Sequence, residues 1–215
     1  MYWHALKTST NLQPALQLAL EEKLQGPNRG RAGNLGSLWY TNRYEEQFAT
    51  QLDSHAILAR VYGNEVANLL PALHEILPAQ LQVEFVQYFV ARAHSAGPVH
   101  IDGNVRHCAL NFPVHGADKG TMEWFAGDAF DRAFVNNTRV GTRVPGARTE
   151  LWKAIPKTLD SFPAPVAYLV LTEPFLVNSG EWHRVNNTRN DEYRIVASVR
   201  FVGNPTFEDA KCLLG

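Results

Sequence analysis

Hydrophobic positions in the first 80 residues recur at the spacing of helices. From residue 12 to residue 24 apolar residues recur at three- and four-residue steps, at Leu12, Leu16, Ala19/Leu20 and Leu24, and Gly26 follows them. This spacing predicts one amphipathic helix that ends near the glycine. A second apolar pattern covers residues 64–77 and contains Pro71, which predicts a kinked helix or two short helices. Residues 1–80 are therefore expected to form a mainly helical N-terminal part.

Beyond residue 80 the pattern changes to the alternation of β-strands. The stretch QVEFVQYFVARA (82–93) alternates and is rich in β-branched and aromatic residues. Turn residues separate further short segments of this kind, at 105–114, 121–125, 166–171, 174–178, 182–186 and 193–202. Helices followed by strands predict an α+β protein built on a β-sandwich or barrel. The length of 215 residues favours a single domain over residues 1–215.

Two segments depart from these patterns. Residues 26–37 (GPNRGRAGNLGS) are dense in glycine and predict a surface loop, with a lid as the alternative. Residues 128–165 are polar and proline-rich, and they are expected to interrupt the strands. Such an insertion sets substrate specificity in some proteins, while an intersubunit contact or a simple connector is an equal alternative.

Charge and cysteine content narrow the function classes. Lys and Arg number 20 and Asp and Glu 21, the formal net charge is -1, and no run of five like charges occurs. Nucleic acid is therefore not an expected partner. The chain shows neither a signal-peptide pattern nor an apolar stretch of membrane-spanning length, which predicts a cytoplasmic protein without membrane attachment. In that compartment Cys108 and Cys212 are expected to be reduced thiols.

A candidate metal site begins in HIDGNVRHCALNFPV (100–114). On a strand His100 and Asp102 project to one side, about 7 Å apart along the backbone. A histidine nitrogen and a carboxylate oxygen suit Fe, Mn, Zn or Cu, but two ligands hold a transition metal poorly. The best third ligand is His183, which follows a Ser-Gly turn in EPFLVNSGEWHRVNN (173–187).

A candidate anion site lies in RIVASVRF (194–201). Arg194, Ser198 and Arg200 share one face of this predicted strand, and the opposite face is wholly apolar. A guanidinium and a hydroxyl four residues apart suit a dianionic acid, because the guanidinium forms a charge-assisted fork and the hydroxyl adds a hydrogen bond.

Together, His100-Ile101-Asp102, the later His183 and the following Arg194 resemble the His-x-Asp … His … Arg signature of Fe(II)- and 2-oxoglutarate-dependent dioxygenases. The resemblance covers roughly residues 82–202. It implies a double-stranded β-helix, or jelly-roll, core over residues 81–204 with the N-terminal helices packed on the outside.

The resemblance also implies an activity and its site residues. His100, Asp102 and His183 would bind Fe(II), and Arg194 would hold the distal carboxylate of 2-oxoglutarate with Ser198 as a helper. Arg200, on the same face as Arg194, is the alternative arginine. The implied reaction is hydroxylation of an unactivated C–H bond of a small molecule, amino acid or peptide side chain by O₂, with release of succinate and CO₂. Desaturation or ring closure stays open.

The same residues also fit other roles. His100 and Asp102 also fit a strand-edge pair before a turn, His183 a buried core histidine, and Arg194 an internal salt bridge. Arg106 and Asn111 are candidates only for supporting or substrate-binding groups, and Trp124 for the wall of a substrate cavity or the core. The alternative functions are a cupin-like jelly-roll binding or structural module without oxygenase activity, and a zinc or manganese hydrolase or isomerase.

Overall fold

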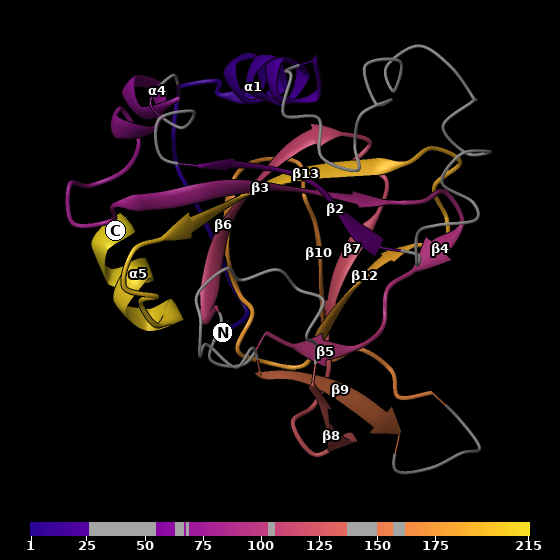
Figure 1. Ribbon diagram of the computed structural model, residues 1–215. Coiled ribbons are helices and arrows are strands. Elements are labelled where there is room, and N and C mark those ends of the chain that lie inside the picture. Colours follow the sequence, from indigo (N-terminus) through magenta and orange to yellow (C-terminus); the bar gives the residue numbers. More distant parts are fainter. Residues whose placement is uncertain (26–54, 63–66, 68, 103–105, 137–149, 157–161) are drawn as a thin grey trace.

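The computed structural model describes residues 1–25, 55–62, 67, 69–102, 106–136, 150–156 and 162–215. Strands dominate this part of the chain (Figure 1). The strands are β1 (Trp3–Ala5), β2 (His55–Tyr62), β3 (Val83–Ala91), β4 (Ser95–Ala96), β5 (His100–Ile101), β6 (Cys108–His115), β7 (Thr121–Trp124), β8 (Phe130–Asn136), β9 (Glu150–Pro156), β10 (Ala167–Val170), β11 (Phe175–Asn178), β12 (His183–Asn187) and β13 (Arg194–Phe201). The helices are α1 (Gln13–Gln25), α4 (Leu70–His74) and α5 (Phe207–Leu214).

The strands form two antiparallel sheets. The first sheet has the order β1-β11-β6-β13-β3-β2, and the second has the order β10-β7-β12-β5-β9-β8, with β4 pairing with β12. Within them, β11-β6-β13-β3 and β10-β7-β12-β5 each make a four-stranded unit, and the chain crosses repeatedly from one unit to the other. This order agrees with the expected jelly roll, in which two antiparallel sheets face each other.

Helices are few and are not confined to the N-terminal part. The predicted helix at 12–24 corresponds to α1, in which Leu16 and Leu20 are fully buried. Within 64–77 the described helix is the five-residue α4, and Pro71 lies in its first turn, where a missing N–H costs nothing. In the described part of the chain a further helix, α5, follows the last strand. None of the helices in the described ranges is long and apolar enough to cross a membrane.

The described part of the first 80 residues also contributes two strands, which the hydrophobic pattern did not predict. β1 pairs with β11 and β2 with β3, so these strands form the two edges of the first sheet. β1 has three residues, too few to show alternation. The pairing of β2 shifts register between Ile57 and Ala59, and such a bulge breaks the period-two pattern that predicts a strand.

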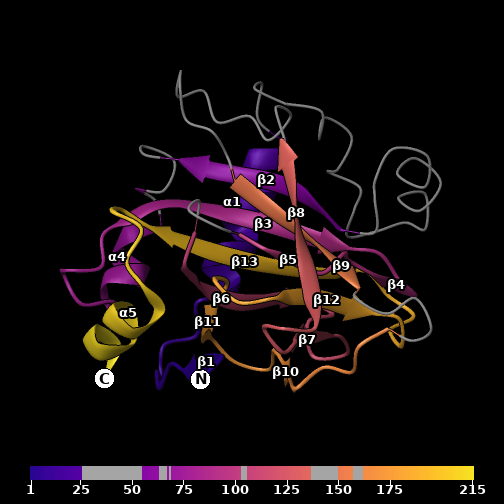
Figure 2. The ribbon, with the colours of Figure 1, turned by 90° about the horizontal axis from the view of Figure 1, so that it is seen from below.

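The segment 128–165 likewise contains two strands where an interruption was expected. β8 and β9 pair with each other along their whole length, and β9 extends the second sheet from β5. Figure 2 shows the two strands lying side by side next to β5. The glycine-rich stretch 26–37 lies outside the described residues.

In the first sheet, successive side chains point to opposite faces, and the two faces have different surroundings. On β13, Ile195, Ala197 and Val199 belong to the largest hydrophobic cluster, which also contains buried residues of α1, α4 and α5. Val196 packs instead with Trp124 and other residues of the second sheet. The apolar face of β13 therefore lies under the helices, and its other face, which carries the two arginines and the serine, points between the sheets.

Both cysteines are free thiols, in agreement with the prediction. Cys108 lies on β6 and is buried, with its Sγ 3.4 Å from the carbonyl oxygen of Pro205. Burial raises the pKa of the Cys108 thiol to about 12. Cys212 lies on α5 and is exposed. At neutral pH the buried thiol is therefore uncharged and chemically inert.

Candidate metal centre

Two neighbouring strands bring the predicted ligands together. His100 begins β5, Asp102 directly follows this strand, and His183 begins β12. β5 and β12 pair antiparallel with His183 opposite His100, so the two imidazoles project from the same face of the sheet. His183 also lies opposite Trp124, whose side chain packs between the sheets. The two histidines therefore face the interior of the sandwich.

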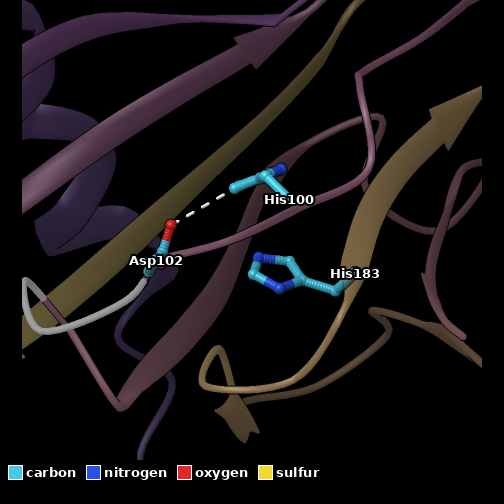
Figure 3. Close-up of side chains that lie close together, drawn as sticks. All are labelled: His100, Asp102 and His183. Atoms are coloured by element: carbon cyan, nitrogen blue, oxygen red, sulfur yellow. Dashed lines mark ion pairs between the residues drawn. The ribbon is translucent and has the colours of Figure 1, made fainter. Parts of the chain in front are cut away.

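The donor atoms of the three residues converge. One ligand atom from each of His100, Asp102 and His183 lies within 4.8 Å of the others. His100 Nε2 is 3.5 Å from Asp102 Oδ1, and the two imidazole centroids are 4.4 Å apart. Figure 3 shows the His183 ring beside the His100–Asp102 pair. Two imidazole nitrogens and one carboxylate oxygen form a donor set that suits Fe(II) and other divalent transition metals.

Backbone carbonyls fix the orientation of both imidazoles. His100 Nδ1 lies 2.9 Å from the carbonyl oxygen of Pro98, and His183 Nδ1 lies 2.8 Å from that of Glu181. Because a carbonyl only accepts, each Nδ1 must carry the hydrogen and donate it. This leaves the lone pair of a neutral imidazole on Nε2, the nitrogen that is free to bind a metal.

The surroundings shift the pKa values of His100, Asp102 and His183 in different directions. Burial, helped by the positive charge of protonated His100, lowers the pKa of His183 to about 3. Burial alone would raise the pKa of Asp102, but Arg106 and the hydrogen bond with His100 outweigh it and hold that pKa well below its usual range. Burial also acts to lower the pKa of His100, yet the interactions with Asp102 prevail and raise it. At neutral pH His183 is therefore neutral and Asp102 ionised, as metal binding requires.

Arg106 contacts the carboxylate ligand directly. Its Nε and one terminal nitrogen donate to Asp102 Oδ2 at 2.8 and 2.5 Å. Its other terminal nitrogen donates to Ser198 Oγ at 3.0 Å. The guanidinium also lies over the ring of Phe89, 5.4 Å from its centroid. Ser198, expected to help hold a co-substrate, is thus an acceptor for Arg106.

The two candidate anion-binding arginines differ in their surroundings. Arg194 is 3% exposed, its Nε has no hydrogen-bond partner, and no described residue forms an ion pair with it. Burial lowers the pKa of Arg194 to about 10. Arg200 Nε is also without a hydrogen bond of good geometry, but it lies 2.9 Å from Glu84 Oε2 and forms an ion pair with that carboxylate. Only Arg194 is thus a buried cation without a carboxylate partner among the described residues.

The remaining candidates occupy the space between the sheets. Asn111 lies opposite Ser198 in the β6–β13 pairing, and its Oδ1 is buried without a hydrogen-bond partner. Trp124 is fully buried, its indole Nε1 donates to the carbonyl of Asn178 at 2.8 Å, and its ring packs against Trp3. Trp124 is therefore a core residue whose one polar atom is satisfied.

Sequence reasoning missed the contacts that orient the ligands. The carbonyls of Pro98 and Glu181 each come two residues before a histidine, and carbonyl positions leave no residue-type signal. Arg106 was predicted only as a supporting or substrate-binding group within the expected strand 105–114. The structure places it between β5 and β6, in contact with Asp102.

Comparison with known proteins assigns neither a family nor an activity. No family model matches the sequence, and no curated protein matches it. Similar solved structures include Peruvianin-I, a cysteine peptidase from Thevetia peruviana latex (12% identity, 71% of this chain and 64% of that one, TM-score 0.33). An oxalate oxidase in complex with the substrate analogue glycolate has 12% identity over 73% of this chain and 56% of that one, with a TM-score of 0.34. A hydroquinone 1,2-dioxygenase in complex with Cd²⁺ and 4-hydroxybenzonitrile has 12% identity over 62% of this chain and 72% of that one, with a TM-score of 0.30. The chain spans less than two thirds of the first two proteins, and scores this low carry no argument about function.

Proposed function

We propose that the protein is an Fe(II)- and 2-oxoglutarate-dependent oxygenase that hydroxylates an unactivated C–H bond of a small molecule, amino acid or peptide side chain. The observation that carries the proposal is the convergence of one ligand atom each from His100, Asp102 and His183, with the Nδ1 of both imidazoles turned to backbone carbonyls. Three protein atoms on one side of a six-coordinate ion leave three positions open on the other side, enough for a bidentate 2-oxo acid and O₂.

The protein's part in this reaction is ligation, orientation and exclusion of water. When bound, the iron and 2-oxoglutarate would supply the oxidising chemistry, with succinate and CO₂ as co-products. His183 is 2% exposed and the side chains of His100 and Asp102 are 16% and 12% exposed, so little water reaches the three donors. A poorly hydrated site strengthens electrostatic contacts with a charged co-substrate.

Arg194 is the proposed partner of the distal carboxylate of 2-oxoglutarate. An unpaired guanidinium is costly to bury, and an anionic ligand would offset that cost. Its face of β13 points between the sheets, as do the metal ligands. Arg200 is a weaker candidate because Glu84 already neutralises it.

Thermal unfolding in the presence of Mn²⁺, added in place of Fe(II), tests the co-substrate assignment. A ligand that binds only the native state raises its melting temperature. We expect Mn²⁺ to raise the Tm of the wild-type protein, and 2-oxoglutarate to raise it by several degrees more. Arg194→Ala should keep the Mn²⁺ increment and lose the 2-oxoglutarate increment.

The matched control for that experiment is Arg200→Ala, which removes an arginine from the same face of the same strand. It should keep both increments, although the loss of its ion pair with Glu84 lowers the starting Tm. A wild-type Tm that is indifferent to 2-oxoglutarate at saturating Mn²⁺ would contradict the proposal and favour a jelly-roll metal-binding or structural module.

A further inference from the structure

The two carboxylate oxygens of Asp102 contact different residues. Its Oδ2 accepts two N–H groups from Arg106, at 2.8 and 2.5 Å, and its Oδ1 faces His100 Nε2 at 3.5 Å. A planar guanidinium that donates twice to one oxygen strongly reduces the ability of that oxygen to bind a cation. Asp102 therefore has one oxygen available for a metal.

A second strand and an aromatic ring hold the guanidinium in place. The remaining terminal nitrogen of Arg106 donates to Ser198 Oγ on β13, in the opposite sheet from β5 and β12. Phe89 on β3 lies against the guanidinium face. The Arg106 side chain, 16% exposed, thus ties the metal-binding end of one sheet to the inner face of the other.

From these contacts we propose that Arg106 is a positioning residue that keeps Asp102 a one-oxygen metal ligand. The inference rests on the proposed metal site and deepens it. If both carboxylate oxygens bound a six-coordinate ion, one of the three open positions would be lost, and a bidentate co-substrate together with O₂ would no longer fit. Arg106 acts through Asp102 and need not touch substrate.

The test is Co²⁺ binding to the metal-free protein, read both as affinity and as the visible absorption spectrum of the bound ion, which reports its coordination. Arg106→Lys keeps the charge but loses the planar fork. We expect it to weaken Co²⁺ binding about tenfold, the low end of losses when an outer-shell partner of a ligand is removed, and to change the spectrum. Ser198→Ala, which removes only the anchor on β13, should weaken binding about threefold in the same direction.

Arg184→Gln is the matched control. Arg184 is a similarly buried arginine that pairs with Glu123, with 2.7 Å between Nε and Oε2, on the outer face of the second sheet. Its loss should lower thermal stability and leave Co²⁺ affinity and spectrum unchanged. If Arg106→Lys does not fold, Ser198→Ala against this control still decides the question.

Each outcome has a distinct meaning. Wild-type affinity and spectrum in both Arg106→Lys and Ser198→Ala would overturn the positioning role. Tighter binding in Arg106→Gln with no change in Arg106→Lys would also overturn it, since Arg106 would then act through charge alone. A wild-type protein that binds no Co²⁺ would overturn the metal site and this inference together. Normal Co²⁺ results without binding of 2-oxoglutarate would overturn only the proposed reaction.

Discussion

Neighbouring groups fix the orientation of each side chain in the candidate metal site. Each histidine donates its Nδ1 hydrogen to a carbonyl two residues earlier in the chain, and Asp102 is held by Arg106. The three donor atoms are therefore oriented before any ion arrives. Preorganisation of this kind increases metal affinity, because the side chains lose little rotational freedom on binding.

Gly120 illustrates how little space surrounds the buried arginine. A Cβ at this position would lie 2.5 Å from Asn187 Oδ1 and 3.1 Å from Arg194 Cδ. Asn187 cannot retreat, because it is fully buried and its Nδ2 donates to the carbonyls of Arg92 and Glu192. We expect Gly120→Ala to lower the free energy of unfolding by about 1–3 kcal/mol, as overpacking does.

Urea denaturation of wild type and Gly120→Ala measures that loss. Gly127→Ala is the matched control, because a Cβ there would meet no atom within 4 Å. Equal stability of the wild-type and Gly120→Ala proteins would show that the packing around Arg194 is looser than described.

The elements of the fold were predictable where the hydrophobic pattern is regular. The seven predicted strand segments correspond to β3, β6, β7, β10, β11, β12 and β13, because each has one face under the helices or between the sheets. The bulged β2 lacks that pattern and was missed. β8 and β9 were missed because they lie within the polar, proline-rich segment 128–165, which was expected to interrupt the strands.

Some residues of the candidate site could likewise be predicted from the sequence, and others could not. The types and order of His100, Asp102 and His183 indicated a metal site before any geometry was known. The sequence favoured Arg194 and kept Arg200 as the alternative, since parity places both on one face. Their difference arises from pairing across strands: Arg200 lies beside the β3 segment that carries Glu84, and Arg194 lies at the other end of β13.

The hydrogen bond between α1 and the first sheet is expected to make the stability of the fold depend on pH. Tyr88 on β3 is fully buried, and its hydroxyl donates to the carbonyl oxygen of Leu16 on α1 at 2.7 Å. We expect Tyr88→Phe to cost about 1 kcal/mol at pH 7, the usual net contribution of one hydrogen bond.

The sign of the pH dependence follows from burial, which raises the pKa of Tyr88 above its usual value. A group whose pKa is higher in the folded state stabilises the fold fully below its unfolded pKa, about 10 for tyrosine. That stabilisation is lost as the pH rises further. Denaturation at pH 7 and pH 11 should therefore show the gap between wild type and Tyr88→Phe narrowing at the higher pH. A gap that widens would contradict this account.

At the scale of the whole molecule, the two faces of the first sheet have different roles. Its outer face packs against α1, α4 and α5 in the largest hydrophobic cluster. Its inner face carries the polar side chains of β13 toward the second sheet, where the predicted metal ligands lie. The helices thus stabilise a scaffold whose interior is free to hold polar groups.

The proposed activity requires one ion bound by two imidazoles and one carboxylate, with a 2-oxo acid chelated beside it. Addition of Fe(II) and then 2-oxoglutarate to the protein without oxygen tests this most directly, because the chelated ion gives a weak visible charge-transfer band. We predict the band in the wild-type protein and its loss in His183→Ala. Wild-type protein that binds Fe(II) but gives no band, or a His183→Ala variant that keeps it, would contradict the account.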